Sequence, residues 1–184
     1  MIPLTTLWLP ILLSTVIVFI ASNILWMALP FWHRRDYGRL ADERPILDAV
    51  SGVASGQYIA PYVNWSKLPR EERDAMMKRP MALLLVRNPA KFSFPTALIS
   101  YFVYTLAITI LIAYIPAVTL RPGTPYLQVF RIVGTAGILA YSFGSITDSI
   151  WYGKPWVVTT KEIVDGIIYG LLTAGVFGWL WPHA

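Results

Sequence analysis

The sequence predicts an all-α integral membrane protein: a four-transmembrane-helix bundle with an inner, partly helical interfacial segment between the first and second spanning helices. Composition and the spacing of apolar runs predict this. Apolar residues make up 56% of the 184 residues and charged residues only 14%, whereas a soluble domain usually carries about 25% charged residues. A chain so poor in charge has too little polar surface to face water on all sides, so we expect one membrane domain in lipid.

Four runs are long and apolar enough to cross the roughly 30 Å hydrocarbon core of a bilayer, which takes about 20 helical residues. They cover residues 7–29, 94–117, 126–147 and 163–181. The first two contain no charged residue, and the others contain one each, Arg131 and Asp165. We expect Arg131 to extend to the membrane surface. Basic residues follow the first run rather than precede it, which predicts a retained helix and not a cleaved signal peptide.

The distribution of Lys and Arg predicts the orientation, because cytoplasmic loops are enriched in both. The segment 31–92 contains 11 of the 15 Lys and Arg residues: Arg34, Arg35, Arg39, Arg44, Lys67, Arg70, Arg73, Lys78, Arg79, Arg87 and Lys91. This segment is therefore predicted to be cytoplasmic, with both termini outside. Tryptophans prefer the membrane interface, and seven of the eight fall at a predicted interface. Those at the outer interface are Trp8, Trp179 and Trp181, and those at the inner one are Trp26, Trp32, Trp151 and Trp156. Trp65 falls in the loop.

The inner segment is predicted to be partly helical. Pro45 with the apolar residues after it predicts a short amphipathic helix, and Pro69 begins a second one that stops before Pro80. The apolar run over 81–86 is too short to span a bilayer. We expect it to lie at the interface or to cover the inner ends of the bundle, and we expect the segment to be no separate enzyme domain.

The third and fourth spanning helices each have a small and polar face that is expected to meet other helices. On the third this face carries Gly134, Tyr141, Ser145 and Asp148, opposite an aliphatic face that is expected to meet lipid. The fourth is expected to start with a capping box of Thr159 and Glu162. It also carries a ladder of small residues, which predicts an interface with a second copy of the chain or with a partner membrane protein: Gly166, Gly170, Ala174 and Gly178.

An ionisable group inside a membrane is costly and is a functional candidate by default. Asp148 and Asp165 are both expected near the inner ends of their helices. In one interpretation they face each other, together with Glu162, Tyr141 and Tyr169, as a ligand or ion site. In the other, which we favour, Asp165 caps its helix beside Glu162 and Asp148 pairs with Lys154 or an arginine. Asn23 is expected to bond to a neighbouring helix.

Several kinds of chemistry are not predicted. The chain has no cysteine and two histidines, His33 and His183, which the predicted topology places at opposite sides of the bilayer. We therefore expect no metal site and no cofactor. No phosphate-binding loop and no catalytic motif is present, so we assign no catalytic residue. The net charge of +5 is explained by membrane orientation, and no nucleic-acid partner is expected.

The C-terminal half resembles a family of small, uncharacterised four-helix bacterial inner-membrane proteins. The resemblance rests on DSIWYGKPW at 148–156, KEIVDG at 161–166 and GWLWP at 178–182, with GQY at 56–58 and PY at 61–62. It covers most of the chain and implies the same four-helix layout in a bacterial inner membrane. The family has no established activity, so the resemblance implies no function and no site residue.

Three functions are compatible with these patterns. The one that we favour is a non-enzymatic accessory or scaffolding component of the membrane. The second is a small proton- or cation-coupled transporter or carrier that uses Asp148 and Asp165. The third, a membrane enzyme, would use Asp148 with Glu162 as an acid–base pair. A cavity beside these carboxylates favours the carrier or the enzyme, and a tightly packed bundle favours the scaffold.

Overall fold

The computed structural model describes residues 1–64 and 66–183, so Trp65 lies outside the described residues. Within these ranges, four helical segments are long and apolar enough to cross a membrane: Leu4–Ala28, Phe94–Thr119, Tyr126–Tyr152 and Trp156–Trp179. The predicted four-helix class is thereby confirmed. The chain divides into two compact units, one made of Met1–Gly38 with Pro95–Ala184 and the other of Arg39–Phe94.

The first span is a helix that changes its winding near its C-terminal end. A short 3₁₀ turn, η1 (Leu4–Leu7), leads into α1 (Trp8–Asn23), which continues as one π-helical turn, η2 (Ile24–Ala28). In this turn the Leu29 amide donates to the carbonyl of Ile24, five residues back, at 3.0 Å. The short helix α2 (Pro30–His33) follows and brings the chain towards the last span.

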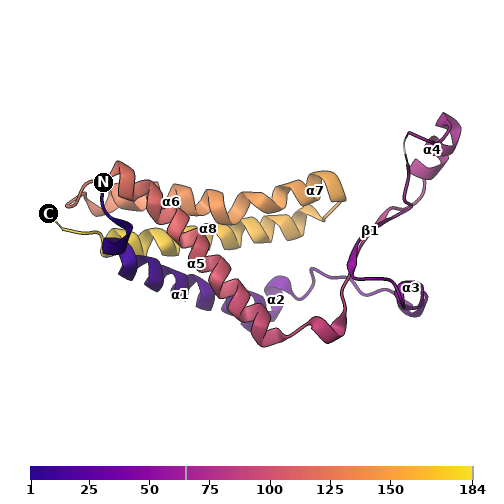
Figure 1. The fold of residues 1–184 in the computed structure, drawn as a ribbon, viewed down its shortest axis with the longest axis horizontal. Coiled ribbons are helices and arrows are strands. Elements are labelled where there is room, and N and C mark those ends of the chain that lie inside the picture. The colour runs from indigo at the N-terminus through magenta and orange to yellow at the C-terminus, as the bar shows by residue number, and fades with distance from the viewer. Residues whose placement is uncertain (65, 184) are drawn as a thin grey trace. The chain divides into compact units, whose positions relative to one another are not determined.

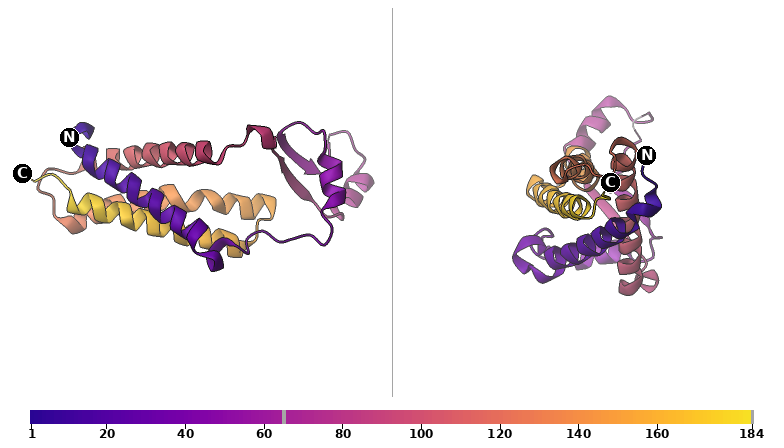
Figure 2. Two further views of the ribbon diagram at one scale, coloured as in Figure 1. Left: turned by 90° about the horizontal axis from the view of Figure 1, so that it is seen from below. Right: turned by 90° about the vertical axis from the view of Figure 1, so that its left-hand side faces the viewer.

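The other three spans are α5 (Phe94–Thr119), the consecutive segments α6 (Tyr126–Ser142), η4 (Phe143–Ser145) and α7 (Ile146–Tyr152), and α8 (Trp156–Trp179). Figures 1 and 2 show α6 and α8 side by side along their length, with both termini at the same end of the unit. The helix α8 begins seven residues before its predicted start, because Pro155 precedes its first turn.

The earlier start of α8 overturns two predictions. The capping box is wrong, because Thr159 lies inside the helix and bonds to the Ser149 hydroxyl at 2.5 Å, while Glu162 bonds to Lys154. The helix cap at Asp165 is also wrong, since this residue lies in the third turn of α8. The charged residues at the start of this run are therefore part of the helix and carry tertiary contacts.

The small residues of α8 pack against α6 of the same chain. A Cβ atom built on Gly170 would lie 2.7 Å from the backbone nitrogen of Ile138, and one built on Gly166 would lie 2.7 Å from the backbone of Tyr141. Helices that approach this closely need residues without side chains at the contact. The ladder is therefore covered within the chain, which corrects the prediction that these positions form an interface with another protein.

The apolar core occupies the end of this unit where the termini lie. It includes Leu7 of η1, Ala113 of α5, Val133 of α6 and Phe177 of α8, all fully buried. Burial along α5 is confined to the part from Thr105 onward. The first turns of α5 lie outside this core. The candidate site lies among the four helices at the height of these turns.

The second unit contains a two-stranded antiparallel sheet that was not predicted. Strand β1 (Gly56–Ala60) pairs antiparallel with β2 (Ala82–Val86), with Tyr58 opposite Leu84. The apolar run over 81–86, predicted to lie at the membrane interface, is therefore mostly a strand. The helices α3 (Arg44–Val50) and α4 (Arg70–Met77) confirm the two predicted short helices, and a 3₁₀ turn, η3 (Pro89–Lys91), follows β2.

Candidate functional site

A network of charged and polar groups joins the segment after the first span to α8. The imidazole of His33 lies between two carboxylates: Nδ1 is 2.5 Å from Oδ2 of Asp36, and Nε2 is 2.7 Å from Oδ2 of Asp165. Lys161 donates to Oδ1 of Asp36 at 2.5 Å. We call His33, Asp36, Lys161 and Asp165 the charge cluster. Trp32 supports it, because its indole nitrogen donates to Oδ1 of Asp165 at 2.7 Å.

The charge cluster is shielded from solvent. The side chains of His33, Asp36 and Asp165 are only 3–4% exposed, and that of Lys161 is 18% exposed. Such burial is tolerated because each carboxylate oxygen has a hydrogen-bond partner. Burial raises the pKa of Asp36, but the hydrogen bonds and charges of Lys161 and His33 outweigh it and hold the pKa below its ordinary value of 3.8. Asp36 is therefore ionised at neutral pH.

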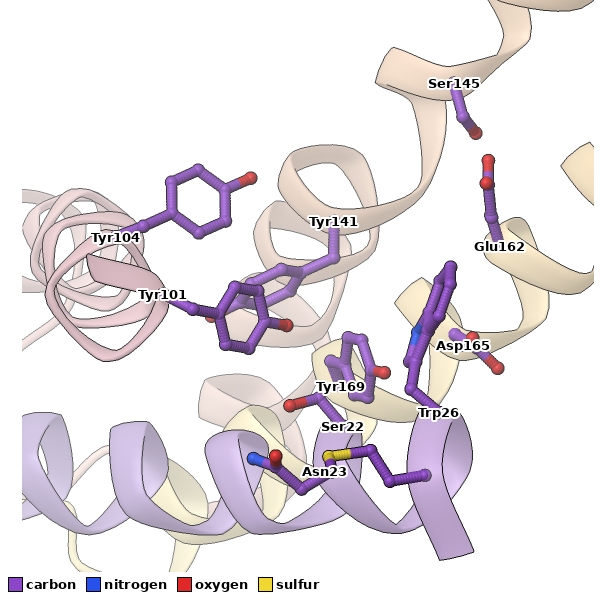
Figure 3. Close-up of a pocket in the computed structure, with 11 residues that line it drawn as sticks. Ser22, Asn23, Trp26, Tyr101, Tyr104, Tyr141, Ser145, Glu162, Asp165 and Tyr169 are labelled. Carbon is purple, nitrogen blue, oxygen red and sulfur yellow. The ribbon is translucent and has the colours of Figure 1, made fainter. Parts of the chain in front are cut away.

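A pocket of about 420 Å³ lies on the other side of Asp165. Side chains from α1, η2, α5, α6, η4 and α8 line it, as Figure 3 shows: Ser22, Asn23, Trp26, Met27, Tyr101, Tyr104, Tyr141, Ser145, Glu162, Asp165 and Tyr169. The volume falls within the range of roughly 300–1,000 Å³ that is usual for small-molecule sites. The pocket and the charge cluster share one residue, Asp165.

Aromatic rings form most of the pocket wall. Tyr141 and Tyr169 meet edge to face with their ring centres 5.8 Å apart, and Tyr101 lies 6.0 Å from Tyr104. Trp26 has two roles, because its ring both lines the pocket and stacks on the imidazole of His33 at 3.8 Å. The same indole ring thus lies next to both the pocket and the charge cluster.

The hydroxyl of Tyr169 is an unpaired polar group in this wall. Tyr169 is 6% exposed, and its hydroxyl oxygen has no hydrogen-bond partner among the described residues. A buried hydroxyl without a partner costs roughly 1–3 kcal/mol. The neighbouring indole of Trp26, a water molecule or a molecule bound in the pocket could each satisfy it.

The structure distributes the five predicted site residues between two places. Asp165, Glu162, Tyr141 and Tyr169 line the pocket, but Asp148 does not. The side chain of Asp148 is half exposed and lies 3.9 Å from Lys154, as one interpretation predicted. Lys154 also contacts both carboxylate oxygens of Glu162 at 2.6 Å. The two aspartates therefore have different partners and do not form the predicted carboxylate pair.

Two further predictions about polar groups need correction. Asn23 donates to the carbonyl of Phe19 in its own helix at 2.7 Å, although it was expected to bond to a neighbouring helix. His33 was considered only as a metal ligand, and its role between Asp36 and Asp165 was missed. The sequence did contain a signal for this role. His33 and Asp36 are three residues apart, and Lys161 and Asp165 are four apart. Both spacings are typical of neighbours on one helical face.

Comparisons of the chain with protein-family models, with curated proteins and with solved structures found no match. The described residues also contain no group of three or more side chains arranged to hold a metal ion. The pocket and the charge cluster are therefore the features from which a function can be inferred.

Proposed function

We propose that the protein is a small membrane carrier that binds an organic ammonium cation in the pocket between α1, α5, α6 and α8. The observation that carries this proposal is the composition of the pocket wall. It combines five aromatic rings and two carboxylates, while no lysine or arginine side chain of the described residues lines it. This combination is suited to a positively charged guest.

Two physical effects favour a cation over an anion or a neutral molecule. The face of an aromatic ring carries partial negative charge, so rings that surround a cation stabilise it by about 0.5–2 kcal/mol each, more when water is excluded. Asp165 adds a formal negative charge at the wall. Glu162 contributes less, because both of its oxygens face Lys154. Tyr169 offers its unpaired hydroxyl to a polar group of the guest.

The pocket also supports the carrier over a scaffolding role. A scaffold requires a packed bundle, which α6 and α8 provide through their glycine contacts. It does not require a cavity that is lined by carboxylates and contains an unpaired buried hydroxyl. The acid–base pair that an enzyme would need is weakened, because Asp148 does not line the pocket with Glu162.

Calorimetric titration with choline tests the proposal. We expect choline to bind the purified protein in detergent, and we expect its neutral carbon isostere, dimethylbutanol, to bind at least ten-fold more weakly. The two molecules have nearly the same shape, so the difference reports the charge. Equal binding of both, or no binding of choline by the folded protein, contradicts a cation site and favours a neutral guest or a scaffold.

Variants of the pocket wall extend this test. Asp165→Asn should weaken choline binding about ten-fold or more, because it removes the charge at the wall, while Asp74→Asn on the exposed helix α4 should change nothing. Tyr101→Leu should weaken binding about three- to ten-fold through the loss of one ring, and Tyr101→Phe should preserve it. Similar effects of the leucine and phenylalanine variants would exclude a contribution from the ring face.

The proposed location is a bacterial inner membrane with both termini outside, supported by the family resemblance and by the basic segment 31–92. Single cysteines at Ser66 and Thr124 test the orientation, since the natural chain has no cysteine. In intact cells an impermeant maleimide should label Thr124→Cys and should label Ser66→Cys only after the membrane is opened. Labelling of Ser66→Cys in intact cells would reverse the orientation.

An assembly of several copies remains a separate prediction. The four α8 positions named for it pack against α6, so copies would associate through other faces. The mass of the protein in detergent, measured by light scattering, distinguishes one copy from several. The pocket itself is lined from within a single chain, so the proposed binding does not depend on this result.

A further inference from the structure

We propose that the charge cluster binds one proton and that this proton is exchanged for the cation that enters the pocket. The inference rests on the proposed function and names the ion that is coupled to it. It follows from the number of hydrogens that the cluster needs, from its charge, and from the position of Asp165, which belongs to the cluster and also lines the pocket.

The hydrogen-bond geometry of His33 requires a second proton. Nδ1 and Nε2 both lie within hydrogen-bond distance of a carboxylate oxygen, at 2.5 and 2.7 Å. A neutral imidazole has one N–H and an ionised carboxylate has none, so one of the two contacts would bring a lone pair against an oxygen. Both contacts become hydrogen bonds when one more proton is present.

The other contacts of the two carboxylates restrict where this proton lies. Oδ1 of Asp36 accepts from Lys161, and Oδ1 of Asp165 accepts from the indole of Trp32. Ammonium and indole N–H groups are donors only, so neither Oδ1 faces a group that could accept a proton from it. We place the proton on His33, whose two N–H groups then donate to the two Oδ2 atoms.

The charge of the cluster changes with this proton. Asp36 and Asp165 contribute two negative charges and Lys161 one positive charge, so the cluster is neutral with the extra proton and carries one negative charge without it. An isolated charge that is buried this deeply is strongly unfavourable. Loss of the proton must then be balanced by another cation close to Asp165.

The pocket is the place where this balancing cation can bind. Asp165 lines it directly, and the Trp26 ring that stacks on His33 lines it as well. Glu162, which is paired with Lys154, is another ionisable group at the wall. The remaining ones are four phenols: Tyr101, Tyr104, Tyr141 and Tyr169. Among these described residues, Asp165 is the carboxylate without a lysine or arginine partner.

The exchange is balanced in charge and atoms. The ammonium cation enters the pocket beside Asp165, the extra proton leaves His33 for water, and no covalent bond other than that N–H is broken. In each of the two states, one positive charge, that of the extra proton or that of the ammonium cation, neutralises the charge cluster. Binding of the proton and binding of the cation are mutually weakening, as linkage requires for two ligands that share one counter-charge.

Nitrogen NMR of the imidazole tests the proton site without any ligand. The chain has two histidines, so the variant His183→Gln, changed at an exposed position, leaves His33 as the single source of signal. With ¹⁵N-labelled histidine at neutral pH, we expect both ring nitrogens to show the shift of a protonated nitrogen. A spectrum of a neutral imidazole overturns the proton site, whether or not choline binds.

Calorimetry in two buffers of different protonation enthalpy tests the exchange. We expect the binding of choline to release close to one proton, and its affinity to rise up to about tenfold per pH unit where the proton is still bound. His33→Gln, which cannot hold the second proton, should bind choline with no such pH dependence. Choline binding without proton release overturns the exchange and leaves the proposed function standing, whereas absence of choline binding overturns both.

Discussion

The Asp36→Asn variant should lose about 3 kcal/mol of unfolding free energy at neutral pH. Asp36 is 3% exposed and is the counter-ion of Lys161 and of His33. Removing one member of a buried ion pair costs about 3–5 kcal/mol, because the other member stays buried without a counter-charge. We expect the lower end of this range, since Lys161 is partly exposed and still donates to the carbonyl of Trp32. Denaturant titration in detergent micelles measures the loss.

The pH dependence of this loss identifies its cause. The pKa of Asp36 is lower in the folded protein than its ordinary value of 3.8, because Lys161 and His33 more than offset the effect of burial. A lowered pKa stabilises the fold at pH values above 3.8, and this stabilisation disappears as the pH falls through the folded-state pKa. The difference between natural protein and variant should therefore be complete at pH 7 and vanish in strong acid. A difference that stays constant over this range would rule out the ion pair as its origin.

A matched control is available in Asp42. Hydrogen bonds from Arg44 lower the pKa of Asp42 as well, but the side chains of both residues are at least half exposed. Exposed pairs contribute little because water and salt screen them. Asp42→Asn should leave the unfolding transition unchanged at every pH, which separates the effect of burial from that of a charge partner.

Gly170→Leu should prevent native packing of the last span. Its Cβ would lie 2.7 Å from the backbone nitrogen of Ile138 and 3.0 Å from the carbonyl carbon of Gly137. These are backbone atoms, so α6 and α8 would have to move apart, and overpacking of this kind costs about 3 kcal/mol or more. We expect a large fall in the yield of folded protein, measured by size-exclusion chromatography and by thermal unfolding in detergent.

Gly144→Leu is the corresponding control. Gly144 lies in η4, and a Cβ there would meet nothing within 4 Å. The same change of residue at this position should leave yield and thermal stability close to those of the natural protein. If the two leucine variants behaved alike, close contact between α6 and α8 would not be what Gly170 provides.

The spanning helices could be predicted because a bilayer imposes a minimum length of apolar residues on each. The start of α8 could not, since Lys161, Glu162 and Asp165 were interpreted as the polar end of the run. In the structure these charges are satisfied by Trp32, Asp36, Lys154 and His33, so the helix continues through them. The two-stranded sheet in the second unit was missed because each strand has only five residues, and a short apolar run does not distinguish a strand from a helical segment.

The candidate site was predicted in part. Residue type and helical spacing identified Asp165, Glu162, Tyr141 and Tyr169, which all line the pocket. The partner of Asp165 was not identified, because His33 lies more than a hundred residues earlier in the chain. The contributions of Tyr101 and Tyr104 were also missed. Nothing in the spacing along α5 distinguishes these two tyrosines from others that face lipid.

The π-helical turn Ile24–Ala28 lets the first span carry one additional residue at the wall of the pocket. A π turn contains one residue more than an α-helical turn would need, and such turns are frequent at functional sites. Deleting Met27 would let the helix continue with ordinary winding, and the direction in which α2 starts would stay nearly the same, because four residues at about 100° each turn the chain about as far as the five residues of the π turn. His33 and Trp32 would then still face α8, whereas the pocket would lose one of the residues that line it. In a lineage of related chains, the gain or loss of this single codon would change the pocket and leave the charge cluster in place.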